Sequence, residues 1–283
     1  AIRRPFESLR EQTYPNWEWI IVDDSDDGGR TFAMLRRLAR TDHRIQVFKP
    51  GEHSGVIGRV KKWACSLAKG EFLVELDHDD ELTDYALDCV VKGFAQYPEA
   101  GFLYTDCAEI YPDRTSHTYR DGWAFGYGSY TDVAYRGRWY KSGSGGNINA
   151  KTIRHIVSTP NHIRAWRRRF YESIGGHNRE LPVADDYEIV VRTFLKTRMI
   201  RVPRLCYLQY LGNTAQEQRN RDIHRHVRSI RLHYDRMIHE RLLSLGCEDF
   251  AWDEKKGCSD YLLPNPPVES HATLIADLRD RGR

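Results

Sequence analysis

Closely spaced carboxylates are the feature of this sequence best able to do chemistry. Asp77, Asp79 and Asp80 directly follow the apolar run at 72–76, which is typical of a buried strand. Carboxylates this close raise one another's pKa unless they share a cation. Mg²⁺ usually takes one or two protein carboxylates and fills its shell with water and substrate phosphates, and Mn²⁺ accepts the same oxygen ligands. The pattern favours an Mg²⁺ or Mn²⁺ site over the alternative, in which these acids cap the next helix.

A second acidic run lies at 23–27, directly after the short apolar strand expected at 17–22. Around both runs the sequence alternates between short apolar stretches and amphipathic helical ones. Ligands of such α/β sheets bind outside the carboxyl ends of the strands. We therefore expect the loops at 23–27 and 77–80 to lie close together on one edge of a sheet.

The elements that must position these acids follow from hydrophobic periodicity and turn residues. The expected helices are 3–12, 30–40, 56–69, 83–97, 166–174, 185–196 and 217–245. The expected strands are 17–22, 45–48, 72–76, 100–105, 199–202 and 206–210. Gly70 is expected to close the helix at 56–69, in the usual way for a glycine after a helix C-terminus. The long helix at 217–245 has an apolar stripe at helical spacing, formed by Ile223, Val227, Ile230, Tyr234 and Ile238.

Residues 111–150 break this alternation. The segment is rich in Gly, Tyr, Trp and Ser, too aromatic for a solvated linker and too rich in glycine for a helix. We interpret it as a long functional loop that orders over a ligand, with a locally packed surface excursion as the alternative. The chain ends in a proline-rich linker and a short helix, which could join a further domain or a partner.

Composition narrows the class of protein. The chain has 283 residues with 43 basic and 40 acidic side chains, a formal charge of +3, which argues against a nucleic-acid coat protein. No apolar run approaches the roughly 18 residues needed to span a bilayer, and the first residues do not resemble a signal peptide. Six scattered cysteines form no CxxC pair, which argues against a zinc site and against a secreted disulfide scaffold. We expect a cytoplasmic protein without a nucleic-acid partner or a transmembrane segment.

Three segments, in this order along the chain, resemble the family 2 glycosyltransferases of the GT-A fold. They are SLREQTYPNWEWIIVDDSDDGG at 8–29, AKGEFLVELDHDDELTDYAL at 68–87 and FYESIGGHNRELPVADDYEIVVRTF at 170–194. The resemblance implies a GT-A-type, Rossmann-like mixed α/β sheet flanked by helices. It divides the chain into a nucleotide-sugar-binding half at 1–110, an acceptor-binding half of the same domain at 111–215 and a C-terminal helical extension at 216–283. It also implies an apolar strand before the helix at 3–12, where this sequence begins, so that either the record is truncated or the edge of the nucleotide pocket is built differently.

The resemblance assigns donor-binding residues. Asp24 is expected to accept a hydrogen bond from the nucleotide base, Asp77 to lie near the ribose, and Asp79 to bind the metal that bridges the diphosphate. Asp77 is also expected at the metal, and Asp23 and His78 belong to the expected donor site. Lys61 and Lys62 stand where the family usually has an Arg-Asn pair, and they could neutralise phosphate or simply lie on an exposed helix face.

The resemblance also assigns the acceptor side. Asp186 matches the general base of the family, which takes the proton of an acceptor hydroxyl in the transition state. One base opposite the leaving group implies in-line attack with inversion, and Asp185 is either a helper or the cap of the helix. The residues expected where an acceptor sugar docks, with core or surface packing as the alternative, are His162, Arg164, Trp166 and His177.

The sequence therefore predicts a metal-dependent, inverting glycosyltransferase that uses a nucleotide-sugar donor, with a UDP-sugar preferred, and a glycan or glycoside acceptor. One alternative is a catalytically inactive carbohydrate- or nucleotide-binding module of the same fold. A sugar-phosphate nucleotidyltransferase ranks last, because it would need a glycine-rich phosphate loop and none is visible.

Overall fold

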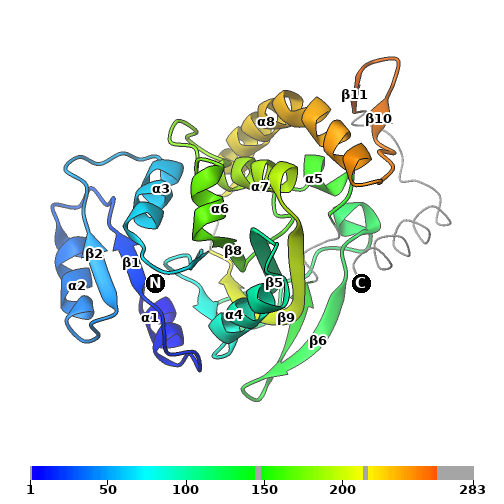
Figure 1. Ribbon diagram of the computed structural model, residues 1–283. Coiled ribbons are helices and arrows are strands. Elements are labelled where there is room, and N and C mark those ends of the chain that lie inside the picture. Colours follow the sequence, from blue (N-terminus) through cyan, green and yellow to red (C-terminus); the bar gives the residue numbers. More distant parts are fainter. Residues whose placement is uncertain (1, 144–147, 213–215, 260–283) are drawn as a thin grey trace.

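Two main β-sheets with helices on their faces form the body of the computed structural model, which describes residues 2–143, 148–212 and 216–259 (Figure 1). A separate two-stranded sheet is formed by Trp252–Asp253 and Cys258–Ser259. In the smaller of the two main sheets, β1 (Trp19–Val22) pairs in parallel with β2 (Ile45–Phe48). The helices on this side of the molecule are α1 (Arg3–Arg10), α2 (Arg30–Ala39) and α3 (Ile57–Leu67). Helix α2 packs against β2, and α3 packs against β1.

The larger sheet has seven strands and is mixed. Its main path runs in the order β3 (Phe72–Val74), β8 (Arg164–Arg167), β5 (Phe102–Ile110), β7 (Arg138–Gly143) and β6 (Tyr130–Tyr135). Strand β9 (Met199–Tyr210) runs parallel to β5 and antiparallel to the short β4 (Glu81–Leu82). Nearly every residue of β5 is buried, as expected for a central strand covered on both faces. The predicted mixed α/β sheet flanked by helices is confirmed.

The remaining elements include α7, which carries Asp185 and Asp186. They are α4 (Ala86–Gln96), η1 (Trp123–Gly126), α5 (Thr152–His155), α6 (Arg168–Ser173), α7 (Asp185–Lys196), α8 (Gln216–Ser244), β10 (Trp252–Asp253) and β11 (Cys258–Ser259). Figure 1 shows α7 and α8 side by side above the large sheet, and the two helices are in contact. The predicted apolar stripe of α8 is confirmed, because Val227, Ile230 and Ile238 are buried in one core cluster with α7. The expected proline-rich linker and last helix lie outside the described residues.

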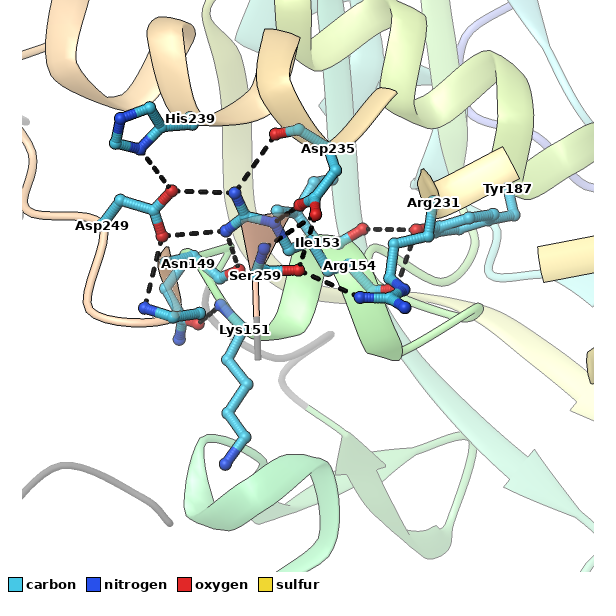
Figure 2. A network of polar contacts seen from close by, with 12 residues as sticks. Asn149, Lys151, Ile153, Arg154, Tyr187, Arg231, Asp235, His239, Asp249 and Ser259 are labelled. Atoms are coloured by element: carbon cyan, nitrogen blue, oxygen red, sulfur yellow. Dashed lines mark hydrogen bonds and ion pairs between the residues drawn. The ribbon is translucent and has the colours of Figure 1, made fainter. Parts of the chain in front are cut away.

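A buried network of ion pairs fixes α8 and the β10–β11 hairpin to α5 (Figure 2). Arg154 is fully buried and bonds to Asp235 through Nε at 2.7 Å and to both carboxylate oxygens of Asp249 at 2.8 and 2.9 Å. Asp249 also contacts His239 at 2.9 Å, and Asp235 accepts hydrogen bonds from Ser259. We call these five residues the Arg154 network.

Three expected boundaries are wrong. The strands expected at 199–202 and 206–210 are one strand, because both segments pair with β5. A bulge at Pro203 and Arg204, where proline cannot donate to the ladder, separates the two paired segments. The helix expected at 83–97 begins at Ala86, because Thr83 is held to β9 by hydrogen bonds to the backbone oxygens of Leu205 and Cys206. Helix α3 ends at Leu67 with extended Ala68, so Gly70 does not cap it.

The segment at 111–150 is not a continuous loop. Its second part folds into the hairpin β6–β7, which turns at Arg136-Gly137 with positive φ at both residues and joins the large sheet through β5. Alternating residues on either side of a two-residue turn that ends in glycine are typical of a hairpin, and this sequence signal was missed. Residues 111–129 keep a largely irregular course, with η1 inside it.

A cavity of about 330 Å³ separates the two sheets. Strands β1 and β3 line its two sides but are not paired with each other, so the two acidic loops follow strands of different sheets. The expectation that both lie on the edge of one sheet is therefore wrong. One part of the cavity wall is polar and contains Lys61, Glu75, Asp77 and His177. None of the helices in the described part of the chain has the length and apolar character to cross a membrane.

Candidate active site

The acidic loop after β3 presents two of its three aspartates outward. The carboxylates of Asp77 and Asp79 are each 41% exposed. His162 Nε2 lies 3.7 Å from Asp77 Oδ2, and His78 Nδ1 lies 3.8 Å from Asp79 Oδ1. Burial lowers the pKa of His162 to about 4, although Asp77 opposes this, so the ring faces the loop as a neutral group at pH 7.

The third aspartate points inward. Asp80 is buried and accepts hydrogen bonds from the Tyr207 hydroxyl at 2.9 Å and the Tyr210 backbone N–H at 2.7 Å, both on β9. Burial raises the pKa of Asp80 to about 7, although these two hydrogen bonds lower it. The Tyr207 hydroxyl also accepts a hydrogen bond from the Asp77 N–H at 3.1 Å. Asp80 therefore holds the loop against the sheet, and the three acids do not act as one outward group.

The outward pair fits a hard divalent cation. Among the described residues no group of three or more His, Cys, Asp and Glu side chains could hold a metal ion by itself. Two exposed carboxylates match a cation that takes one or two protein ligands and completes its shell with water and phosphate oxygens. Asp77 and Asp79 are therefore the residues that would hold Mg²⁺ or Mn²⁺ together with a diphosphate.

The aspartates of the acidic run after β1 bond to residues of the neighbouring loops. Asp24 accepts hydrogen bonds from Ser54 N and Oγ and from Gly55 N, each at 2.9 Å, and the backbone oxygen of Asp24 contacts His53. Burial alone would raise the pKa of Asp24, but the hydrogen bonds from Ser54 and Gly55 outweigh it and lower the pKa. Asp23 is buried and pairs with Lys49 at 3.3 Å. Both aspartates therefore anchor the loops beside β1.

A buried charged group that sequence reasoning missed lies at the centre of the site. Glu75, on the β3 side of the cavity, is 2.9 Å from His177 Nε2, 3.1 Å from Lys61 Nζ and 3.6 Å from Arg164 Nη1. Burial would raise the pKa of Glu75, yet Lys61, His177 and Arg164 hold it well below its usual value. The signal was present in the sequence, since a glutamate inside the apolar run FLVEL must find partners when the strand is buried.

Arg164 joins this group to the acidic pair on α7. Its Nη1 lies 3.1 Å from Asp186 Oδ2, and His177 Nε2 lies 3.9 Å from Asp185 Oδ2. We call the six residues joined in this way the Glu75 cluster: Lys61, Glu75, Arg164, His177, Asp185 and Asp186. Glu75 is two residues before Asp77 in the chain, and both line the same cavity, so the cluster lies beside the outward acids.

The two aspartates of α7 differ in access and in charge. The Asp186 side chain is 32% exposed, and the Asp185 side chain is only 5% exposed. Burial would raise the pKa of Asp186, but Arg164 and Lys61 lower it, so the carboxylate is ionised at neutral pH. Burial raises the pKa of Asp185, with Lys61 and His177 opposing. The N-cap residue of α7 is Ala184, so Asp185 lies inside the helix and the capping alternative for it is wrong.

Lys61 and Lys62 have different environments. Lys61 points from α3 to Glu75, and although burial would lower its pKa, Glu75 and the neighbouring aspartates raise it. The alternative of an exposed helix face is therefore wrong for Lys61, and its charge is balanced inside the protein. Lys62 is half-buried on the same helix.

The residues expected at the acceptor are mostly buried. Trp166 is 1% exposed, belongs to β8 and donates its Nε1 hydrogen to Thr193 at 3.0 Å. It therefore offers no ring face to a sugar, and the expectation that it stacks on an acceptor is wrong. Arg164 and His177 are buried in the Glu75 cluster, where they pair with its carboxylates and are not accessible from solvent. His162 is buried as well, but its ring faces Asp77.

Comparison with known proteins identifies the family of the chain. The family described as Glycosyl transferase family 2 matches residues 1–175, more than half of the chain. The putative colanic acid biosynthesis glycosyl transferase WcaA of Escherichia coli K12 is 30% identical over 196 residues, 67% of this chain and 60% of that protein. Chondroitin synthase of Pasteurella multocida is 23% identical over 222 residues, 78% of this chain. The chain spans 20% of that synthase and 20% of the protein y4gI of Sinorhizobium fredii.

Solved structures agree on the fold. The structure of Staphylococcus aureus TarS 1–349 in complex with UDP-GlcNAc has a TM-score of 0.59 at 16% identity, and the match covers 99% of this chain and 76% of that one. The mannosyltransferase PcManGT from Pyrobaculum calidifontis, in complex with GDP-Man and Mn²⁺, has a TM-score of 0.52 at 18% identity, with coverage of 86% and 59%. The chain therefore belongs to glycosyl transferase family 2 and has the GT-A fold of these neighbours.

Proposed function

We propose that the chain is a metal-dependent, inverting glycosyltransferase that moves a sugar from a UDP-sugar to a hydroxyl group of a glycan. One observation carries the proposal. The accessible carboxylate of Asp186 is linked through Arg164 to Glu75, which directly follows β3 and precedes the loop that carries Asp77 and Asp79. A candidate base and a candidate metal site therefore belong to one electrostatic unit.

Asp186 is the proposed general base. An acceptor hydroxyl is a poor nucleophile until a carboxylate takes its proton in the transition state. Asp186 is ionised and partly exposed, whereas Asp185 is buried and holds its proton more tightly. A single base that faces the side opposite the leaving group produces inversion at the anomeric carbon. Asp185 and Arg164 position Asp186.

Asp77 and Asp79 form the proposed donor end of the site. An Mg²⁺ or Mn²⁺ ion held there would neutralise the charge of the departing diphosphate. Lys62 is the proposed cation for a donor phosphate, since Lys61 is paired with Glu75. Asp23 and Asp24 hold the loops that border the nucleotide, and His78 flanks Asp79. The UDP-GlcNAc complex of TarS supports the choice of uridine, and the Mn²⁺ complex of PcManGT supports the metal.

The test compares two neighbouring carboxylates. Asp186→Asn should keep the Kd for UDP within about two-fold, because the base does not touch the nucleotide, while kcat falls by about 10² to 10⁴. Asp185→Asn is the matched control and should cost much less. The measurements are calorimetric titration with UDP and Mn²⁺ and a transfer assay over a panel of UDP-sugars. A fully active Asp186→Asn would contradict the proposal, and UDP binding without turnover by the unmodified chain would favour the inactive module.

A further inference from the structure

A row of aromatic rings lies beyond the carboxyl end of β5, outside the site described above. It consists of five residues from the irregular segment, η1 and β6: Tyr111, His117, Tyr119, Trp123 and Tyr130. Neighbouring ring centroids in the row are 5.0 to 5.7 Å apart. Tyr119 is 47% exposed and stacks on Trp123 at 28° between the ring planes. Tyr111 is also exposed, and exposed aromatic rings gathered in this way are typical of binding surfaces.

The row is a built structure and not a loose loop. At Gly128 a Cβ atom would lie 2.0 Å from Trp123 Cε2, so the backbone presses directly on the indole. Burial raises the pKa of the Glu109 carboxyl group and the Tyr119 hydroxyl lowers it, and the Tyr119 N–H donates to the Tyr130 hydroxyl at 3.1 Å. Ring positions in the row are therefore fixed from both sides.

A small crevice opens beneath the rings. Its volume is about 20 Å³, enough for one water-sized group, and its walls include Glu109, Trp123, Ser158 and Asn161. Within the part of the chain that the structure describes, Glu109 Oε2 and Trp123 Nε1 are buried without a hydrogen-bond partner. Unpaired polar groups are costly to bury, so a hydroxyl group in the crevice would be stabilised by both atoms.

The crevice adjoins the proposed transfer centre. Asn161 Oδ1 accepts the backbone N–H of His162 at 2.8 Å, and the His162 ring lies 3.7 Å from Asp77. Asn161 Nδ2 donates to Gln209 at 3.0 Å, on the strand next to Glu109. Two consecutive residues therefore connect the crevice to the acidic loop.

We propose that the aromatic row and the Glu109 crevice form a subsite for a neutral sugar ring of the acceptor glycan. The apolar face of a pyranose would lie on Tyr119, and one hydroxyl would enter the crevice between Glu109 Oε2 and Trp123 Nε1. A nucleotide fits less well, because its phosphate would meet the carboxyl group of Glu109. The role of this sugar as acceptor depends on the proposed function, but its binding does not.

The experiment measures glycan binding and transfer separately. Saturation-transfer NMR with a panel of neutral and uronic-acid-containing tetrasaccharides tests binding without any donor. At least one tetrasaccharide should bind, and Tyr119→Ala should weaken binding and raise the acceptor KM by about ten-fold. Glu109→Gln keeps the shape of the crevice and should weaken binding by several-fold. The Kd for UDP should stay within two-fold in both variants.

Trp139→Ala is the matched control, because Trp139 is 71% exposed on β7 and does not belong to the row. It should leave binding unchanged. The inference is overturned if the unmodified chain binds none of the tetrasaccharides, if Tyr119→Ala and Glu109→Gln bind normally, or if Trp139→Ala has an equal effect. Glycan binding without donor hydrolysis or transfer would support the subsite and contradict only the proposed function.

Discussion

The Arg154 network and the Glu75 cluster are both buried sets of ion pairs, but they differ in how completely they are paired. Arg154 uses all three guanidinium nitrogens in bonds of 2.7 to 3.3 Å, and the two carboxylates that face it have further partners (Figure 2). In the Glu75 cluster, Glu75 Oε2 and Asp185 Oδ2 have only longer ion-pair contacts, of 3.6 and 3.9 Å.

This difference in pairing indicates a structural role for the Arg154 network and a functional role for the Glu75 cluster. A fully paired network far from solvent can only hold elements together, which the Arg154 network does for α5, α8 and the β10–β11 hairpin. A partly paired cluster that reaches a cavity and an exposed carboxylate keeps charge available for a ligand. The two sets are also connected, since the Tyr187 hydroxyl on α7 donates to the backbone oxygens of Ile153 and Arg154 at 2.9 Å.

The largest expected effect comes from breaking the Arg154 network. Arg154→Met leaves Asp235 and Asp249 buried without their cation, which should lower the free energy of unfolding by about 3 to 5 kcal/mol. Urea denaturation followed by circular dichroism measures it. Arg198→Met removes an exposed pair with Glu99 and should cost less than about 1 kcal/mol. Similar losses in the two variants would show that the Arg154 network has no special role in stability.

The loss of folding stability at low pH should also originate near the Arg154 network, at His155. Burial, with Arg231 and Arg154 nearby, lowers the pKa of His155 to about 4. The unfolded chain takes up this proton near pH 6.5, so the stabilisation is complete above that pH and is lost as the pH falls toward 4. Relative to His155→Gln, the native chain should lose up to about 3 kcal/mol between pH 7 and 4. Parallel pH profiles of unfolding would contradict a neutral, buried His155.

The smallest effect in this series is expected on the activation free energy of transfer, and it comes from the Glu75 cluster. Glu75→Gln removes the charge that pairs with Lys61 and Arg164, so Asp186 loses its fixed orientation. We expect kcat to fall about ten-fold, a cost of about 1.4 kcal/mol, while the donor KM changes less. Glu71→Gln, on the exposed side of the same strand region, is the control. Equal kcat values for the two variants would show that Glu75 has no role in catalysis.

The elements with clear periodicity could be predicted from the sequence. The strand before Asp77, the helix that begins at Asp185 and the stripe of α8 all follow local patterns of apolar residues. What the sequence could not show depends on partners far away in the chain. Asp80 turns inward because the Tyr207 hydroxyl and the Tyr210 N–H on β9, about 130 positions later in the chain, donate hydrogen bonds to its carboxylate. Trp166 is buried because β8 inserts between β3 and β5, a pairing that no local signal specifies.

The most direct test of the central claim is calorimetric titration of Mn²⁺ in the presence of UDP, with Asp79→Asn and Asp80→Asn compared. The outward carboxylate of Asp79 should be required, so Asp79→Asn should lose the UDP-dependent uptake of Mn²⁺ and retain its melting temperature. Asp80→Asn should still take up the ion, because Asp80 faces the sheet. Retained uptake in Asp79→Asn together with lost uptake in a folded Asp80→Asn would contradict the account.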